Sequence, residues 1–236
     1  MNQKGNPIRI DTSADGVCAK PYALPPIPDF VESRTYRITG ITPILGTQPA
    51  SEEVRTKFVA AKAPSIELEE EERELFEERD QTCGLTVFPR DPDAGDCIIV
   101  LDYMVRGFFK AALGALTKQL NVKNSKSKVD KYLFVSPRRI PLMRDGEPIY
   151  DEDDEYERPL RCETMRGPRV ALQGSERIND PWSAEFTVML VPNAGSKASE
   201  SLDWERVESA LNYGQFSGLG QFRNGSFGRF TWERVA

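Results

Sequence analysis

CIIVLDYMVRGFFKAALGALTKQL, residues 97–120, joins a short apolar run to a long amphipathic segment. CIIVL (97–101) is apolar throughout and rich in β-branched residues, which is typical of a buried strand. Apolar residues then recur at helical spacing, at Val105, Phe108, Phe109, Ala112, Leu113 and Leu116. This spacing predicts a helix over residues 103–120 with one buried face, capped at its amino end by Asp102.

Further strand and helix patterns lie on both sides of this stretch. Strands are predicted at 34–45, 85–88, 131–135 with a bent continuation at 138–143, 184–191 and 226–235, and a short amphipathic helix at 202–213. Between them we expect a lysine-rich loop (121–130), an acidic turn or hairpin tip (145–157) and an arginine-rich β-ribbon (158–178).

Without its insertions, the chain runs strand, helix, strand, strand, helix, strand. This order predicts an α+β fold with a modified ferredoxin-like (RRM-like) βαββαβ core, in which two helices cover one face of an antiparallel sheet. The open face of such a sheet is a common platform for single-stranded RNA. We expect a proline-rich arm (1–33) followed by one domain (34–236) with insertions near 46–82 and 138–178. The first insertion is predicted to hold a helix from Ser51 and a solvated acidic helix after Pro64.

Composition excludes several classes of protein. A chain of 236 residues can bury a core without metal or disulfide staples, and its four cysteines are too widely spaced for a zinc knuckle. We therefore expect free thiols in a reducing compartment, no metal and no cofactor. The absence of histidine excludes Ser-His and Cys-His nucleophiles, so no catalytic residue is predicted. Without a signal-peptide pattern or a long apolar run, a cytoplasmic location and no membrane partner are expected.

The net charge of −6 conceals a basic chain with two acidic blocks, ELEEEERELFEERD (67–80) and DEDDEYE (151–157). Without these blocks the net charge is positive, and residues 118–144 are especially basic, which suits a phosphate backbone. The acidic blocks are predicted to be solvated surface. Alternatively, they repel stray nucleic acid, mimic it or dock a basic partner; residues 151–157 lack the spacing of a calcium loop.

The segment GQFSGLGQFRNGSFGRFTW (214–232) concentrates glycine, aromatic residues and arginine near the end of the chain. A helix C-cap at Gly214 and a turn would need fewer glycines than this. The alternative is a loop whose amides and arginines contact phosphates while Phe216, Phe222 or Phe227 stacks on bases. The candidate nucleic-acid-binding residues are Arg106, Lys110, Lys126, Lys128, Arg138, Arg139, Arg166, Arg169, Gly218, Gly220, Phe222, Arg223, Phe227 and Arg229.

The glycine-rich segment, the βαββαβ order and VRGFFKAAL (105–113) together resemble the RAMP superfamily of CRISPR proteins. The chain looks most like the backbone subunits that line the guide RNA in multi-subunit effector complexes. Members of that family have a modified RRM core, a glycine-rich loop near its carboxyl end and a basic-Gly-aromatic segment that opens the first helix. These features correspond here to residues 218–229 and 106–110.

This resemblance implies an RNA-binding protomer that assembles head to tail along a guide strand. Its partners would be guide RNA or single-stranded DNA, copies of itself and other effector subunits. A β-hairpin thumb would reach over a neighbouring protomer, and residues 138–178 are the candidate. No aspartate matches the one that target-cleaving members use, so binding without catalysis is expected. The alternatives are a phage or mobile-element relative that binds single-stranded DNA or mimics an effector subunit as an inhibitor, and a metal-dependent nuclease.

Overall fold

The computed structural model describes residues 28–50, 84–164, 167–192 and 201–236, and only the backbone of the strands within 160–171. The strands are β1 (Glu32–Gly40), β2 (Ile44–Leu45), β3 (Gln48–Pro49), β4 (Gly84–Val87), β5 (Arg90–Asp91), β6 (Cys97–Leu101), β7 (Leu133–Ser136), β8 (Arg139–Pro141), β9 (Met143–Arg144), β10 (Glu147–Pro148), β11 (Asp154–Thr164), β12 (Gly167–Ile178), β13 (Ser183–Leu190) and β14 (Phe230–Arg234). The α-helices are α3 (Asp102–Ala115), α4 (Thr117–Leu120), α5 (Ser125–Tyr132) and α6 (Trp204–Asn212). Nearly all of the predicted arm 1–33, and the helices predicted from Ser51 and after Pro64, lie outside the described residues.

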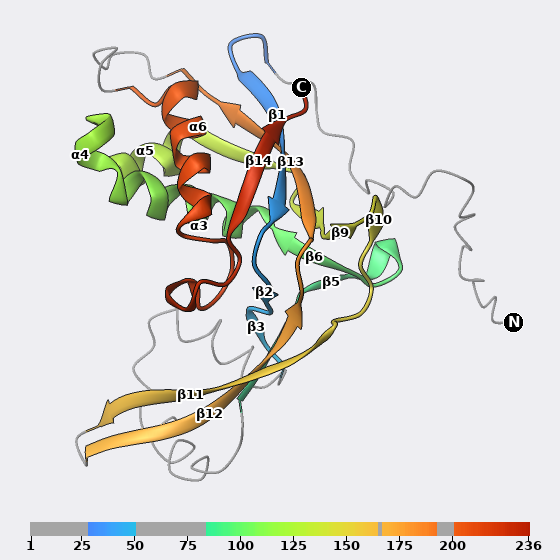
Figure 1. Cartoon of the computed structure of the whole chain (residues 1–236). Coiled ribbons are helices and arrows are strands. Elements are labelled where there is room, and N and C mark those ends of the chain that lie inside the picture. Colours follow the sequence, from blue (N-terminus) through green and yellow to red (C-terminus); the bar gives the residue numbers. More distant parts are fainter. Residues whose placement is uncertain (1–27, 51–83, 165–166, 193–200) are drawn as a thin grey trace, which may run out of the picture.

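The largest sheet has six strands, of which β1 is central (Figure 1). Four of them lie in the order β7, β13, β1, β14, and every neighbouring pair is antiparallel. Tyr36 in β1 lies opposite Phe186 in β13, and Ile38 lies opposite Trp232 in β14. These side chains alternate with polar residues along each strand, as expected for a sheet that is buried on one face only.

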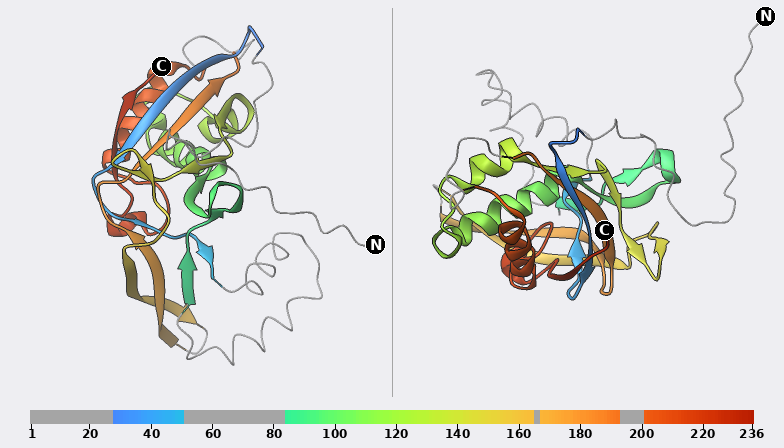
Figure 2. Two further views of the ribbon diagram at one scale, coloured as in Figure 1. Left: turned by 90° about the vertical axis from the view of Figure 1, so that its right-hand side faces the viewer. Right: turned by 90° about the horizontal axis from the view of Figure 1, so that it is seen from above.

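Helices α3, α5 and α6 lie together on one side of this sheet, and the core is between them and the strands (Figures 1 and 2). In α3, the predicted helical stripe is confirmed, since Val105, Phe108, Phe109, Ala112 and Leu113 are all buried. The rings of Phe108 and Phe230 meet edge to face with their centres 5.1 Å apart, which joins α3 to the last strand. The predicted α+β class is therefore confirmed.

Two local predictions about the first helix and the segment after it are wrong. Asp102 is the first residue of α3 rather than its cap; Leu101 occupies the N-cap position, where no side chain caps the helix. The lysine-rich segment predicted as a loop contains helix α5. Its buried side is formed by Ser125 and Val129. Because Val129 is the one large apolar residue among charged neighbours, the sequence shows no helical repeat of apolar residues here.

A long hairpin, β11 paired with β12, extends away from the helices and the six-stranded sheet (Figures 1 and 2). The two strands pair along their whole length, from Asp154 opposite Arg177 to Thr164 opposite Gly167. Near its root, β12 also pairs with β2 and, in parallel, with β4. The predicted arginine-rich ribbon (158–178) therefore comprises all of β12 and most of β11, and the hairpin begins four residues earlier, at Asp154.

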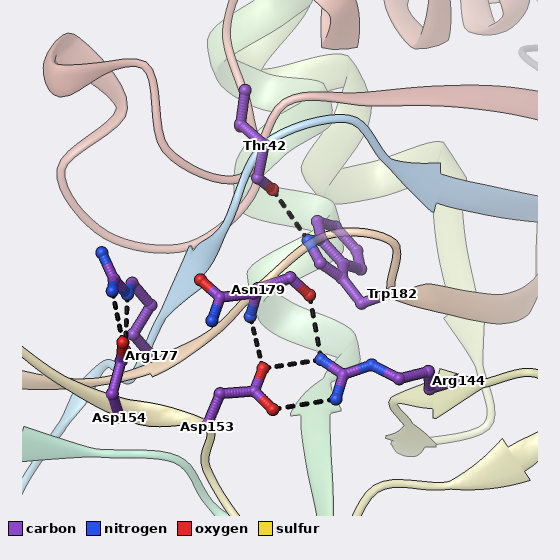
Figure 3. A network of polar contacts seen from close by, with 7 residues as sticks. All are labelled: Thr42, Arg144, Asp153, Asp154, Arg177, Asn179 and Trp182. Atoms are coloured by element: carbon purple, nitrogen blue, oxygen red, sulfur yellow. Dashed lines mark hydrogen bonds and ion pairs between the residues drawn. The ribbon is translucent and has the colours of Figure 1, made fainter.

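The acidic block 151–157 lies at the root of this hairpin. Of the turn or hairpin tip predicted over 145–157, Asp145 and Gly146 do form a tip, between β9 and β10, whereas 151–157 do not. Figure 3 shows Asp153 accepting two hydrogen bonds from Arg144, at 2.8 and 2.6 Å, and one from the Asn179 amide at 2.7 Å. Next to it, Asp154 pairs with Arg177 across the hairpin. The Arg144 guanidinium holds the pKa of Asp153 below its usual range. The block therefore carries internal ion pairs that fix the hairpin, rather than only solvated charge.

Candidate nucleic-acid interface

The glycine-rich loop, residues 214–229, connects α6 to β14 and lies between the helices and the hairpin root (Figures 1 and 2). Its two ends approach so closely that a Cβ atom on Gly218 would collide with the backbone of Gly228. The amide of Leu219 donates to the Gly228 carbonyl at 2.8 Å, and the Gly228 amide donates to the Pro43 carbonyl at 2.7 Å. Gly228 also has φ of 69°, which glycine adopts without strain. Part of the glycine content therefore closes the loop on itself and on the chain before β2.

Three aromatic rings join this loop to the hairpin. The Phe227 ring lies 4.9 Å from the Tyr156 ring of β11 and 5.8 Å from the Phe222 ring. The guanidinium of Arg158, also in β11, lies 4.5 Å from the centre of the Phe222 ring. Phe227 packs between two other rings, whereas the Phe222 side chain is 37% exposed. Of these two predicted stacking residues, Phe222 is therefore the more accessible to a ligand.

Arg158 is 5% exposed and makes only one hydrogen bond within the described part of the chain, from Nη1 to the Ser175 hydroxyl at 3.4 Å. Its Nε is buried without a partner. Burial lowers the pKa of the guanidinium from its ordinary value, although arginine remains charged at neutral pH. A buried cation without a counter-ion is unfavourable, and no acid among the described residues forms an ion pair with Arg158.

A small polar cluster surrounds this arginine. The Ser175 and Thr86 hydroxyl oxygens are 2.7 Å apart, and the Thr86 hydroxyl donates to Gln221 Oε1 at 3.1 Å. Ser175 belongs to β12, Thr86 to β4 and Gln221 to the glycine-rich loop. The cluster therefore brings together hydroxyl and amide groups, with no carboxylate among these contacts.

The predicted arginines Arg223 and Arg229 lie in the same loop, on either side of Phe227. Arg229 donates from Nη2 to the Ser226 hydroxyl at 2.8 Å, and its Nε is buried without a partner. Neither arginine forms an ion pair with any residue that the structure describes. Together with Arg158 we call them the junction arginines; of the three, Arg158 is the one that contacts a predicted phenylalanine, Phe222. Of the predicted glycines, Gly218 closes the loop and Gly220, with φ of 87°, packs near Ile44.

The predicted basic residues of α3 turn toward α5 instead of the loop. Arg106 donates from Nη2 to the Asp130 carbonyl at 3.1 Å, and Lys110 forms an ion pair with the Asp130 carboxylate. Arg106 also lies over the ring of Phe134 at the edge of the sheet, 5.5 Å from its centre. The structure therefore does not bring these two residues into contact with the junction arginines.

The other predicted basic residues are spread over several elements. Arg139 in β8 bonds to both Asp91 and Asp93 at 2.6 Å, so its charge is neutralised internally. Lys126 and Lys128 lie on α5, and Arg138 is exposed just before β8. The backbone of Arg169 pairs with Cys162 in the hairpin, whereas Arg166 lies outside the described residues.

The open face of the six-stranded sheet lacks the aromatic platform of an RRM. In β1, the side chains on this face include Thr35 and Arg37, and Arg37 pairs with Glu185 of β13 and Glu233 of β14 at 3.1 and 3.0 Å. No aromatic residue lies on this face in β1, β13 or β14, which the structure describes in full. In the edge strand β7, Phe134 lies opposite Met189 and is 39% exposed. A strand bound across β1 would meet a neutralised polar surface.

Sequence reasoning missed the residues that connect the loop to the hairpin, namely Arg158, Tyr156 and Gln221. Their role depends on contacts between segments far apart in the chain, which no local pattern reveals. The candidate binding residues chosen from the sequence also omitted Phe216. The Phe216 side chain is 69% exposed, more than the other large apolar side chains in the described residues. Its place in the glycine-rich segment was the available signal.

No protein-family profile matches this chain, and no curated protein matches it. Among solved structures, a chain of a structure described as a type IV-B CRISPR complex is similar. The TM-score is 0.46 at 10% sequence identity, and the match covers 87% of this chain and 91% of that one. In the described residues, no helix is long and apolar enough to cross a membrane, and no group of acidic or cysteine residues is arranged to hold a metal ion.

Proposed function

We propose that this chain is a noncatalytic subunit that binds single-stranded nucleic acid at the junction of its glycine-rich loop and its hairpin. The observation that carries the proposal is the distribution of counter-ions. Many arginines elsewhere pair with acids, namely Arg34, Arg37, Arg90, Arg106, Arg139, Arg144, Arg177 and Arg206. Arg158 lies against the partly exposed Phe222 ring, and Arg223 and Arg229 belong to the same loop as Phe222; none of the three has an acid partner among the described residues. Cations next to stacking surfaces are what an unpaired strand requires.

We further propose that the core is ferredoxin-like and belongs to a CRISPR-type ribonucleoprotein that assembles along a guide RNA. The strand order β7, β13, β1, β14 with α3 and α6 on one face supports the βαββαβ assignment. The motifs at 106–110 and 218–229 support the resemblance to RAMP backbone subunits. The hairpin within 138–178 supports a thumb that contacts a neighbouring copy.

The test is fluorescence polarisation with RNA and DNA oligonucleotides of identical sequence over a series of salt concentrations. The wild type is expected to bind with an affinity that falls as salt rises, and Arg223→Ala with Arg229→Ala should reduce the slope of log K against log salt by about 0.7 per lost phosphate contact. Arg37→Ala is the matched control, because Arg37 is paired on the open sheet face. Absence of binding to either strand, or an unchanged slope in the double variant, contradicts the proposal.

Two further measurements address assembly and catalysis. A long RNA should shift the protein to larger, regularly increasing masses if copies assemble along a strand. Labelled RNA and DNA should remain intact on long incubation with magnesium or manganese. Cleavage that disappears on substitution of a single carboxylate would assign the chain to the metal-dependent nucleases instead.

A further inference from the structure

We propose that Arg158, Ser175, Thr86 and Gln221 form a binding site for one phosphate group of the bound strand, and that this phosphate is the counter-ion of Arg158, which pairs with no acid among the described residues. The inference rests on the proposed function and deepens it by naming the group that the junction recognises. It assigns a role to a buried charge that neither the core nor the hairpin contacts explain.

The cluster has more hydrogen-bond donors than acceptors. A guanidinium carries five N–H donors, and Arg158 uses only one, in a long contact of 3.4 Å to Ser175. The Gln221 Oε1 atom accepts from the Thr86 hydroxyl at 3.1 Å and lies 3.4 Å from the Ser175 hydroxyl, whose proton then serves the 2.7 Å contact with Thr86. This leaves the amide NH2 group of Gln221 to donate elsewhere. Both hydroxyls can rotate to donate to a new acceptor. An acceptor with several oxygens and a negative charge matches this set, and a phosphodiester is such a group.

The acids nearest in sequence do not supply that charge. Glu157 precedes Arg158 in β11, and Glu176 follows Ser175 in β12, but successive residues of a strand point to opposite faces. Glu176 accepts a hydrogen bond from the Phe88 amide at 2.6 Å and lies 3.8 Å from Arg90. Burial raises the pKa of Glu176 from its ordinary value. Asp154 shares the face that carries Arg158, but it is paired with Arg177. Neither it nor these two glutamates is therefore the counter-ion of Arg158.

Phe222 shields this cation without occupying its donors. The ring lies over the guanidinium, 4.5 Å from ring centre to the guanidinium carbon. Guanidinium N–H groups donate within their own plane, so a ring that covers a face excludes water and leaves the edge available. Exclusion of water strengthens the attraction between the guanidinium and a phosphate that reaches this edge.

The most informative variant is Gln221→Glu, which adds a carboxylate inside the cluster. This carboxylate should act as the counter-ion of Arg158, raising the melting temperature while weakening strand binding by about tenfold or more. Gain of stability with loss of affinity cannot result from misfolding. The matched control is Gln215→Glu, which makes the same charge change at an exposed position of the same loop. It should change neither property substantially.

Arg158→Met and Arg158→Lys provide an independent comparison. Met removes the charge and keeps an apolar stem of similar length, so the salt slope should fall by about 0.7, the value for one phosphate contact. Lys retains the charge and should recover part of the affinity. Equal weakening by Gln221→Glu and Gln215→Glu, or wild-type affinity and slope in Arg158→Met, overturns the inference.

Inorganic tripolyphosphate separates this inference from the proposed function. It should raise the melting temperature of the wild type but not of Arg158→Met or Gln221→Glu. Stabilisation that requires Arg158, in a protein that binds neither RNA nor DNA, would support the anion site and contradict the proposed function. If all Arg158 variants bind RNA or DNA as the wild type does, and tripolyphosphate does not change the melting temperature, the proposed function stands and this phosphate site is excluded.

Discussion

The guanidinium of Arg158 lies 4.5 Å from the centre of the Phe222 ring, so a strand of the projecting hairpin and the loop before the last strand share one cation–π contact. The two residues are far apart in the chain, and Phe222 has φ of 53°, a left-handed conformation that is unfavourable for a bulky residue. The surrounding contacts must therefore hold Phe222 in place. Several predictions about stability and binding depend on how they do so.

Phe222→Leu is expected to destabilise the fold by about 1–2 kcal/mol, because it removes the aromatic face above a desolvated guanidinium. The backbone strain remains in this variant, since leucine has the same φ preference as phenylalanine. Phe222→Tyr keeps the ring and should behave as wild type. Urea unfolding followed by circular dichroism measures the difference, and equal stability of the leucine and tyrosine variants would show that the contact contributes nothing.

Gly228→Ala should be among the most damaging single substitutions in the loop, with a cost of about 3 kcal/mol or more. The new Cβ would collide with the Leu219 carbonyl, at a residue whose φ is 69°. Gly146→Ala is a matched control: φ is 87° there, but nothing lies within 4 Å of the added atom. Its cost should be about 1–2 kcal/mol, from the backbone conformation alone. If both variants lose the same stability, the close approach of Gly218 and Gly228 is not required.

Asp153 should make the protein acid-sensitive. Its pKa is lower in the folded state than in the unfolded chain, so its stabilisation is complete above the ordinary aspartate pKa and is lost as pH falls through the lowered value. Asp153→Asn removes this contribution and should reduce the free energy of unfolding at neutral pH. The difference between the two proteins should narrow as pH falls toward about 2. A difference that is constant with pH would show that the Arg144 pair does not govern the titration.

Phe216→Ala should weaken single-strand binding with little change in stability, because its ring is largely exposed. The loss of one stacked base corresponds to about 1–3 kcal/mol of binding free energy. Phe227→Ala should instead lower stability, since that ring packs between Tyr156 and Phe222. Polarisation assays and thermal melts of the two variants separate these effects. An affinity unchanged in Phe216→Ala would remove this ring from the interface.

The parts of the fold that sequence could predict are those with strong local periodicity. Tyr36 and Ile38 alternate with polar residues in β1, and the apolar residues of α3 recur at helical spacing, so both elements were visible. The short helix α5 was not, because Val129 is its one large buried residue. The glycines predicted a backbone under spatial constraint, but not that Gly218 would meet Gly228.

The sequence predicted which kinds of residue form the candidate site, but not which of them lie together in space. Arg223, Arg229 and Phe222 are prominent in a glycine-rich segment, and the structure brings Phe222 against Arg158 of the hairpin. Arg106 and Lys110 looked equally suitable, yet Asp130 on α5 neutralises them. Whether an arginine keeps its charge available depends on which acids the tertiary structure brings near, and spacing along the chain carries no such information.

The root of the hairpin is held at several points, by the Arg144–Asp153 pair, by Arg177–Asp154, and by Trp182, whose Nε1 donates to the Thr42 carbonyl at 2.9 Å (Figure 3). From this root to its far end the hairpin has the length of the 12 residues of β12, or about 40 Å at ~3.3 Å per residue. A hairpin that is fixed at its root holds its far end at a constant distance from that root. If the far end contacts another molecule, the number of residues in the strand would set the distance between that molecule and the hairpin root. Deleting one opposed pair of residues should shorten this distance by about 3 Å.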